Sequence, residues 1–381
     1  MSCLSRIASV AALGLAILMP YEVFAAAPTS IKSVVDRAMA EFYKTNPQAV
    51  AVSVGVYTSG KTYIYNYGAT TPGGHRKPTA DSIYPIASIT KTMTGTLLAQ
   101  AVLEGKVRLD DDVRKYLVGD YPNLEFEGHP IRLKDLLDHR SGLPFFMPDR
   151  PETMPDFEGN VVPWPTRIDN IYKTYTLQDF YNDLHKVKLT AVPGTEFKYS
   201  NTGAALMGYI LENLYGDSYE NLLKKRIFEP LHMSSSTITL TPDQQRRLIP
   251  GFDEKGNRMP PHTDAEPAAG AVKSSVYDML KYARWHMAED SDVTKLSHKP
   301  VLDYGLYTVG LNWQEIRNDD SRIIWQEGNI VGFNSFCIID MKLKTSLVIL
   351  ANEEDPASAH GQALLANEIL KGLNPKSAQM P

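Results

Sequence analysis

The segments that favour β-strands lie near the two ends of this 381-residue chain, and the segments between them favour helices. Residues 49–57 and 61–67 are rich in β-forming residues and are separated by a Thr-Ser-Gly turn, which predicts a hairpin. Near the C-terminus three more β-rich runs occur, at 322–326, 332–340 and 345–351. Because hairpin connections pair strands antiparallel, we expect strands from both ends to share one antiparallel sheet.

Helical patterns precede, separate and follow these strands. Apolar side chains recur at helical spacing in residues 30–46 and 88–104. Further helices are expected at 177–185, 203–215, 219–228, 275–288 and 357–373. The predicted fold is α/β (α+β), an antiparallel sheet flanked by N- and C-terminal helices with a large, mostly helical inserted domain. The discontinuous sheet domain covers 27–86 plus 300–381, the helical domain covers 87–299, and the active site is expected between them.

The N-terminal residues 1–25 have the layout of a secretory signal peptide. Arg6 precedes an apolar run from Ile7 to Met19, and small residues lie next to the expected cleavage site after Ala25. These 13 apolar residues are too few to span a bilayer comfortably. We therefore expect export with cleavage and no stable membrane span, and a bacterial periplasm fits best.

The cysteine content limits how the exported chain is stabilised. The sequence has two cysteines, Cys3 and Cys337, and cleavage of the signal peptide removes the first. A single remaining thiol cannot form an internal disulfide, so the domain must fold on its hydrophobic core alone. Cys337 lies within the apolar run 336–339, which favours a buried structural thiol over a nucleophile.

Several functional classes are excluded because their motifs or charge patterns are missing. No G-x-S-x-G, H-E-x-x-H or G-x-G-x-x-G motif occurs, and the nine histidines do not cluster at metal-ligand spacing. The net charge is −5 and no basic run is present, which argues against a nucleic-acid surface. The acidic run 110–112 is interpreted as a solvated turn. We expect no metal, no cofactor and no nucleic-acid partner, and the oligomeric state stays open.

A serine and a lysine three residues apart begin one of the predicted helices. Ser88-Ile89-Thr90-Lys91 places both side chains on the same helix face. A lysine amine can act as the base that a serine nucleophile needs when burial lowers its pKa. The spacing alone is also compatible with an N-capped helix that carries a surface lysine.

A second polar motif, Tyr199-Ser200-Asn201, follows a Pro-Gly turn and precedes a predicted helix. The Tyr199 phenol can relay a proton, and the Asn201 amide can hold a substrate carbonyl or the Lys91 side chain. By itself the motif is also compatible with an ordinary loop in which Asn201 caps the following helix.

Taken together, the motifs resemble the serine β-lactamase and penicillin-binding protein superfamily. The resemblance rests on the Ser-x-x-Lys and Tyr-Ser-Asn motifs and on the segments 136–144 (LLDHRSGLP), 229–233 (EPLHM) and 332–333 (GF). These are similar to the class C branch, which includes DD-peptidases and esterases. Segments 162–167 and 241–248 are similar to penicillin-binding proteins of the AmpH type.

The resemblance implies a role for each matching residue. Ser88 is the expected acylated nucleophile, Lys91 takes its proton, and Tyr199 is the general base or acid. Asn201 is expected to orient the substrate amide. The expected oxyanion hole combines the backbone N–H of Ser88 with one on the strand at Gly328 or Asn329. His139 is interpreted as a structural histidine.

The third motif of the superfamily, usually Lys-Thr-Gly or His-x-Gly, is here Gln326-Glu327-Gly328. The glycine that allows close approach to substrate is kept, whereas the cation is replaced by a neutral amide. Strand alternation points Gln326 and Gly328 to one face and predicts that Glu327 faces away from the pocket. Loss of a charge-assisted contact should weaken binding of anionic substrates, unless Arg140 or Lys273 substitutes.

The function predicted from these residues is an exported serine hydrolase that works through an acyl-enzyme. Its substrate is expected to be a β-lactam or a peptidoglycan D-Ala-type peptide. Two alternatives stay open, an esterase of the same fold and a non-catalytic protein that binds penicillin or muropeptides. The role of the Pro- and Asp-rich loop at 144–165 is also open.

Overall fold

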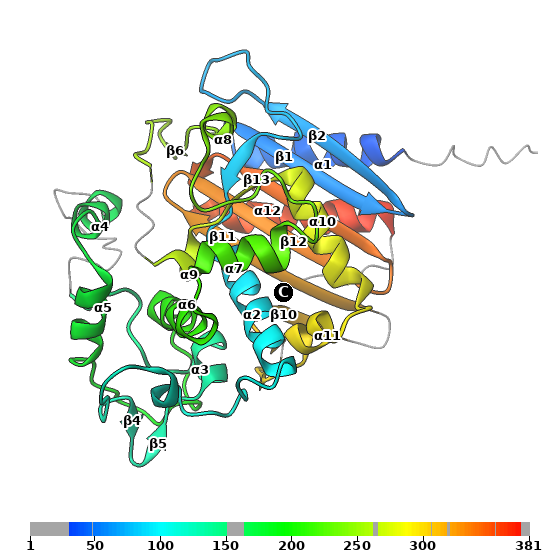
Figure 1. Ribbon diagram of the computed structural model, residues 1–381. Coiled ribbons are helices and arrows are strands. Elements are labelled where there is room, and N and C mark those ends of the chain that lie inside the picture. The colour runs from blue at the N-terminus through cyan, green and yellow to red at the C-terminus, as the bar shows by residue number, and fades with distance from the viewer. Residues whose placement is uncertain are drawn as a thin grey trace, which may run out of the picture.

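The structure is a computed structural model (Figure 1) that describes residues 30–47, 49–150, 164–261, 266–305, 307–317, 321–354 and 356–374. The predicted signal peptide lies outside these residues, as do Cys3 and the middle of the predicted loop at 144–165. Within the described ranges, no helix is both long and apolar enough to cross a membrane.

One eight-stranded sheet forms the centre of the molecule. Its strands follow the order β2-β1-β13-β12-β11-β10-β9-β8, and all neighbours are antiparallel. The strands are β1 Ala51–Thr58, β2 Lys61–Gly68, β8 Leu302–Asp303, β9 Thr308–Val309, β10 Gln314–Arg317, β11 Arg322–Ile330, β12 Phe333–Asp340 and β13 Thr345–Ala351. The N-terminal hairpin joins the C-terminal strands where Val54 of β1 pairs with Ile349 of β13. The predicted α/β fold with a shared antiparallel sheet is confirmed.

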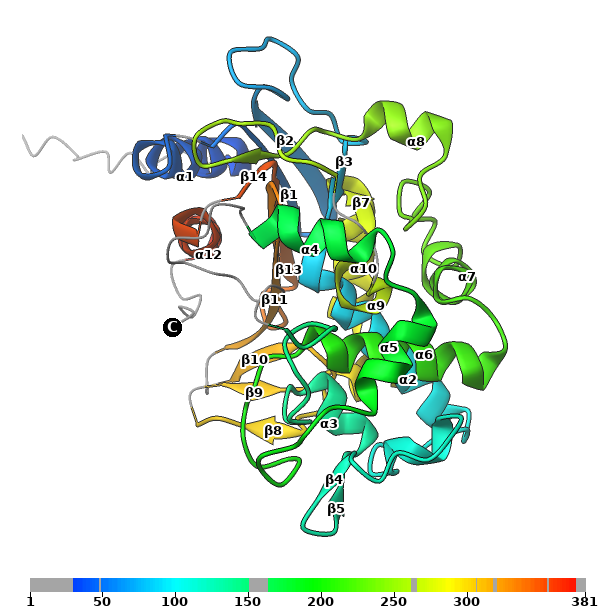
Figure 2. The ribbon, with the colours of Figure 1, turned by 90° about the vertical axis from the view of Figure 1, so that its left-hand side faces the viewer.

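Helices cover both faces of this sheet, as Figure 2 shows. The terminal helices α1 (Ile31–Thr45) and α12 (Pro356–Leu373) pack together on one face, and α10 (Val276–Ala288) packs on the other. Side chains of β13 alternate between the two cores: Ile349 joins the α1 and α12 core, and Val348 joins the core on the α10 side. Burial on both faces explains why these strands consist of nearly continuous apolar runs.

The segment between the two groups of strands contains most of the remaining helices. They are α2 Thr90–Leu103, α3 Leu133–Leu137, α4 Trp164–Tyr172, α5 Leu177–Leu184, α6 Asn201–Tyr215, α7 Tyr219–Leu223, α8 Pro242–Arg247, α9 Pro267–Gly270 and α11 Asp292–His298. Three two-stranded sheets accompany them: β3 Ile83–Pro85 with β7 Lys273–Ser275, β4 Glu125–Phe126 with β5 His129–Pro130, and β6 Phe252–Asp253 with β14 Glu353–Glu354. Helix α2 is buried on nearly all sides. Its threonine hydroxyls contact buried tyrosines, Thr94 with Tyr219 and Thr96 with Tyr282.

Cys337 lies on β12 and faces the core on the α10 side. Its thiol is free and fully buried, and this burial raises its pKa to about 12. The thiolate is therefore scarce at neutral pH, which supports a structural role for this residue.

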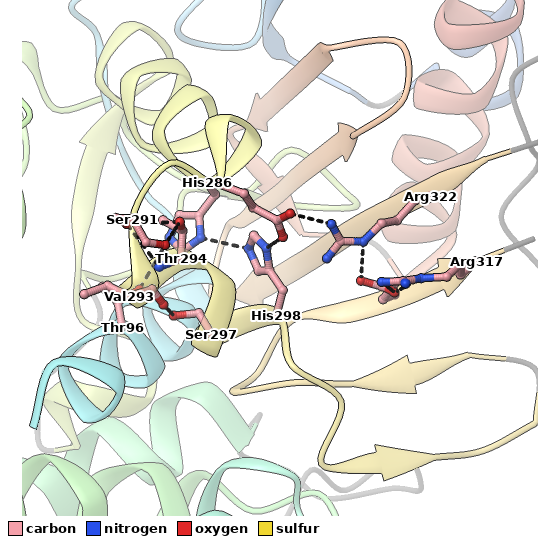
Figure 3. A network of polar contacts seen from close by, with 11 residues as sticks. Thr96, His286, Ser291, Val293, Thr294, Ser297, His298, Arg317 and Arg322 are labelled. Carbon is pink, nitrogen blue, oxygen red and sulfur yellow. Dashed lines mark hydrogen bonds and ion pairs between the residues drawn. The ribbon is translucent and has the colours of Figure 1, made fainter. Parts of the chain in front are cut away.

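A chain of buried polar contacts connects α2 with the sheet, and most of it is visible in Figure 3. His286 on α10 approaches Thr96 on α2 and makes a 2.9 Å hydrogen bond with His298. His298 contacts Glu289 at 2.6 Å, and the other oxygen of Glu289 accepts from Arg322 on β11, also at 2.6 Å. Although burial raises the pKa of Glu289, the hydrogen bonds from His298 and Arg322 outweigh it and hold that pKa at about 2.

Glu289 has the backbone conformation that usually belongs to glycine at a helix C-terminus, with φ 43°. We predict that Glu289→Ala, which keeps this strain and removes both contacts, lowers the free energy of unfolding by about 3 kcal/mol. Chemical denaturation measures the change. The matched control is Lys295→Ala, which breaks only an exposed ion pair with Asp292 and should cost below ~1 kcal/mol. If both variants lower the free energy of unfolding by the same amount, the buried network does not stabilise the protein more than an exposed ion pair does.

Candidate active site

Ser88 lies in a tight turn between a short strand and the buried helix α2. Strand β3 ends at Pro85, and a 3₁₀ turn at Ala87–Ile89 leads directly into α2. Ala87 has φ 46°, a strained conformation for a residue with a Cβ atom. The turn leaves Ser88 partly exposed, while the helix carries Lys91 to the same side.

Lys91 is fully buried, and its ammonium nitrogen has three oxygen neighbours. The Nζ atom lies 3.0 Å from Ser88 Oγ, 2.8 Å from Asn201 Oδ1 and 2.6 Å from the carbonyl oxygen of Ala269. A buried lysine is tolerated only when its donors are paired, and these neighbours match the three N–H bonds of an ammonium. A neutral amine in the same place keeps two donors for Asn201 and Ala269 and turns its lone pair toward Ser88.

Tyr199 contacts the nucleophile from the other side. Its hydroxyl lies 2.7 Å from Ser88 Oγ, and Lys91 Nζ lies 5.0 Å from the centre of its ring. The next residue, Ser200, caps α6 by accepting the N–H of Gly203 and donates its hydroxyl to the carbonyl of Pro144. This cap holds the start of α6, so that Tyr199 and Asn201 both reach Ser88 and Lys91.

His139 supports Tyr199, a relation that the sequence did not indicate. The two rings stack with centroids 4.1 Å apart, and His139 Nδ1 accepts the backbone N–H of Ser200. The carbonyl of His139 accepts from the N–H of Lys198. Burial, reinforced by the charge of Lys91, lowers the pKa of His139 to about 3, so the imidazole is neutral. The structural role predicted for His139 thus includes fixing the loop that carries the tyrosine.

Strand β11 provides the opposite wall of the site. A Cβ atom on Gly328 would lie 2.4 Å from the carbonyl oxygen of Ile86 and 2.9 Å from the backbone nitrogen of Ser88. Only glycine allows this approach between the strand and the nucleophile turn. Asn329 follows at the exposed end of the strand and donates its side chain to Asn334.

Gln326 is buried, and its amide is occupied by the protein itself. The Nε2 atom donates to the carbonyl of Asn312 at 2.7 Å, and Oε1 accepts the backbone N–H of Glu327. Arg140 and Lys273, the two residues that could replace the missing cation of the third motif, are engaged in other contacts. Arg140 pairs with Asp138, and Lys273 donates to carbonyl oxygens of Ile238 and Ala271.

Glu327 pairs with Phe336 of β12, whose side chain joins the α1 and α12 core, whereas Gln326 pairs with Cys337 of the other core. The two side chains therefore lie on opposite faces of β11, in agreement with strand alternation. Glu327 is nevertheless exposed and is among the residues that line the same cavity as Gln326. Strand β10 pairs with β11 only as far as Trp325, so the following edge of β11 is free. The cavity extends along this edge and is lined by both residues.

The cavity in front of Ser88 has a volume of about 650 Å³, which suits a small-molecule or peptide segment. Its walls are largely aromatic, with Phe145, Phe146, Tyr172, Phe197 and Tyr307. Its acidic residues are Asp138, Glu266 and Glu327. Among the described residues, none of the lining side chains is a lysine or an arginine.

Glu266 at the start of α9 is a cavity residue that the sequence reasoning missed. It is 6% exposed, and its Oε1 atom accepts the backbone N–H of Met147 at 3.2 Å. In the described part of the chain, Oε2 has no hydrogen-bond partner of normal geometry, although Tyr172 lies close by. Burial raises the pKa of Glu266 to about 8, against smaller opposing effects of Met147, Lys91 and Tyr172. A carboxyl in the middle of 262–270 gives no sequence signal of such burial.

The comparisons with known proteins agree with this geometry. The family model described as Beta-lactamase matches residues 31–371. The chain belongs to the Beta-lactamase family. It is therefore a member of a family of serine hydrolases, as the resemblance of its motifs predicts.

Relatives in the Beta-lactamase family include both peptidases and β-lactamases. The chain is 32% identical over 263 residues to the D-alanyl-D-alanine-carboxypeptidase/endopeptidase AmpH of Escherichia coli K12, which covers 69% of this chain and 64% of that protein. This chain thus aligns with less than two thirds of the relative. A solved class C β-lactamase has a TM-score of 0.77 at 22% identity and covers 92% of this chain and 98% of its own.

A further solved structure combines two activities in its description. It is a β-lactamase/D-alanine carboxypeptidase from Yersinia pestis, with a TM-score of 0.74, 24% identity and coverage of 90% of this chain and 99% of that one. At these identities the two structures show that the fold is that of class C β-lactamases.

Glu266 gives this Beta-lactamase family member a distinctive dependence of stability on pH. Its folded pKa of about 8 lies above the usual 4.5, so between these values the folded state keeps a proton that the unfolded state has lost. Wild-type stability should therefore fall as pH rises from about 5 to about 8, by at most ~1.4 kcal/mol per pH unit from this group. We predict that Glu266→Gln removes this contribution and becomes progressively more stable than the wild type over the same range.

Denaturation at several pH values measures the difference between the two proteins. Glu41→Gln, at an exposed carboxylate on α1, is the control and should leave the pH dependence unchanged. A constant difference between Glu266→Gln and the wild type from pH 5 to 9 would show that Glu266 titrates normally.

Proposed function

We propose that this protein is an exported serine hydrolase that forms an acyl-enzyme at Ser88 and acts on β-lactams or peptidoglycan D-Ala-type peptides. The observation that carries the proposal is the position of Ser88 Oγ, 2.7 Å from the Tyr199 hydroxyl and 3.0 Å from Lys91 Nζ. A nucleophile within hydrogen-bond reach of two proton-transfer groups is the arrangement that covalent catalysis needs.

In acylation, Lys91 as the neutral amine takes the proton of Ser88 while Oγ bonds to the substrate carbonyl carbon. The carbonyl oxygen becomes an oxyanion that faces the backbone N–H groups of Ser88 and Asn329. When the intermediate collapses, the bond to the leaving nitrogen or oxygen breaks. Tyr199 donates its proton to that atom and recovers one from Lys91. Asn201, whose Oδ1 holds Lys91, has Nδ2 available for the substrate amide.

Hydrolysis of the acyl-enzyme repeats these transfers with water in place of Ser88. Water loses a proton to the neutral Lys91 amine, directly or with Tyr199 relaying a proton between them, and bonds to the acyl carbon. When the bond to Ser88 breaks, Lys91 returns that proton to the Ser88 oxygen. Each group thus returns to its starting state, and the cycle requires no metal or cofactor.

The substrate class and the compartment rest on different observations. The similarity to a D-alanyl-D-alanine-carboxypeptidase/endopeptidase and to a β-lactamase/D-alanine carboxypeptidase supports a D-Ala-type peptide or a β-lactam. The signal-peptide layout of residues 1–25 supports export to the periplasm, where peptidoglycan is accessible. The neutral Gln326 in place of a cation favours the esterase alternative among the possible activities.

The first test uses a chromogenic cephalosporin, a D-Ala-D-Ala peptide and a short-chain nitrophenyl ester on one preparation. We expect turnover of at least one of them and a penicillin adduct on Ser88 by mass spectrometry. Ser88→Ala should abolish the adduct and lower kcat at least ~1000-fold. If ligand binds equally well to Ser88→Ala and no substrate is turned over by the wild type, the protein is a non-catalytic binder and the proposal fails.

The second test restores the missing cation. Gln326→Lys should raise the acylation rate by a penicillin about threefold to tenfold, because an ammonium at this position attracts the penicillin carboxylate. The Asn312 carbonyl that now accepts from Gln326 remains available to the lysine. Stopped-flow or gel-based acylation rates measure the effect, with Gln178→Lys at an exposed position on α5, outside the cavity lining, as the positional control. An unchanged rate would mean that the amide at position 326 does not limit anionic substrates.

A further inference from the structure

The charges of the cavity walls show what kind of substrate group they favour. Of its three acidic residues, Asp138 is neutralised by Arg140 at 2.7 Å. Glu266 is uncharged at neutral pH, because burial raises its pKa to about 8. Glu327 remains, and no ion pair involves it among the described residues. Glu327, at the free edge of β11, is therefore the acidic residue that brings a negative charge to the cavity without a cationic partner among the described residues.

The surroundings of Glu327 reinforce this charge with aromatic and amide groups. Burial raises the pKa of the Tyr307 phenol, and the nearby Glu327 carboxylate adds to this rise. The Tyr307 ring is itself held by contacts with Tyr304 and Trp325, at 5.0 and 6.0 Å between centroids. A carboxylate beside an aromatic ring suits an ammonium group, which gains both an ion pair and a cation–π contact.

Glu327 lies one residue from Gly328, the point at which β11 touches the Ser88 turn. A substrate whose carbonyl sits at Ser88 therefore extends along the free edge of β11 past Glu327. The neighbouring Gln326 cannot offset the charge, because its amide hydrogen-bonds with Asn312 and with the backbone of Glu327. The titratable groups that face Glu327 are Tyr307 and His360. Burial raises the pKa of Glu327, and the nearby His360 acts in the opposite direction.

We infer that Glu327 and Tyr307 form a subsite for a positively charged substrate group, so that the enzyme prefers acyl donors bearing an amine near the scissile bond over those ending in a free carboxylate. This inference rests on the proposed acyl-enzyme at Ser88 and adds the substrate charge that the site selects. It assigns to Glu327 the role of a specificity determinant, without a part in proton transfer.

The test compares three acyl donors that share one scissile ester and carry leaving groups of different charge. One N-acyl-D-alanine is esterified with D-lactate, with D-lactamide or with N-(2-aminoethyl)-D-lactamide, which gives an anionic, a neutral and a cationic substrate with the same scissile ester. At neutral pH and low salt, kcat/KM should rise about threefold to tenfold at each step toward the cation. The differences should shrink at high ionic strength, because salt screens exposed charges.

Variants of the subsite identify the residue responsible. Glu327→Gln should remove the difference between the neutral and cationic donors, and Glu327→Lys should reverse the order of all three. Glu41→Gln, at an exposed carboxylate on α1 that pairs with Lys44 and is not part of the cavity lining, should preserve the wild-type order and serves as the control. Tyr307→Leu should weaken the preference for the cation while retaining discrimination against the anion.

The outcomes separate this inference from the proposed function. If no donor is turned over and Ser88 forms no penicillin adduct, the proposed acyl-enzyme itself is wrong. If Ser88 is acylated but the three donors react equally, or the anionic donor reacts fastest, the subsite is overturned. A wild-type preference that survives in Glu327→Gln would likewise overturn the assignment to Glu327.

Discussion

The buried Lys91 side chain is the interaction on which the rest of the site depends. Its nitrogen is withdrawn from water and relies on oxygens from three separate elements, the Ser88 turn, Asn201 of α6 and Ala269 of α9. An unpaired buried ammonium would cost several kcal/mol, so these elements are stable only when they meet at this point. The contacts that stabilise the helical region are thus the same ones that arrange the nucleophile and its base, and the site is assembled whenever the core is packed.

Local sequence patterns predicted most of the fold and half of the site. The hairpin, the C-terminal strands and the long helices follow from hydrophobic periodicity, and Ser88 and Lys91 share a face by helix geometry alone. Tyr199 contacts Ser88 although the two residues are 111 positions apart in the sequence. No local pattern encodes such a contact, so only the resemblance to the superfamily predicted that both residues belong to one site. Strand β11 continues to Ile330, beyond the predicted 326, since pairing with β12 overrides the weak strand preference of Gly and Asn.

The features that sequence reasoning missed depend on tertiary surroundings. The Ala269 contact uses a backbone carbonyl, which any residue provides, and the burial of Glu266 becomes evident only when α9 packs beside the cavity. Alternation placed Glu327 and Gln326 on different faces of the strand, but it says nothing about a missing neighbour that lets one cavity be lined by both. Strand register and edge exposure are set by the whole sheet, and they determine which polar groups a substrate meets.

The single thiol of the described chain has a consequence for how the molecule can be observed. Cys337 lies in the middle of the sheet, between the helical layers, and any reagent must wait for β12 to separate from its packing. Its alkylation rate is therefore a reporter of large-scale opening rather than of loop motion. In a protein that has lost Cys3 together with the predicted signal peptide, that signal needs no engineered label and leaves the active-site cavity untouched.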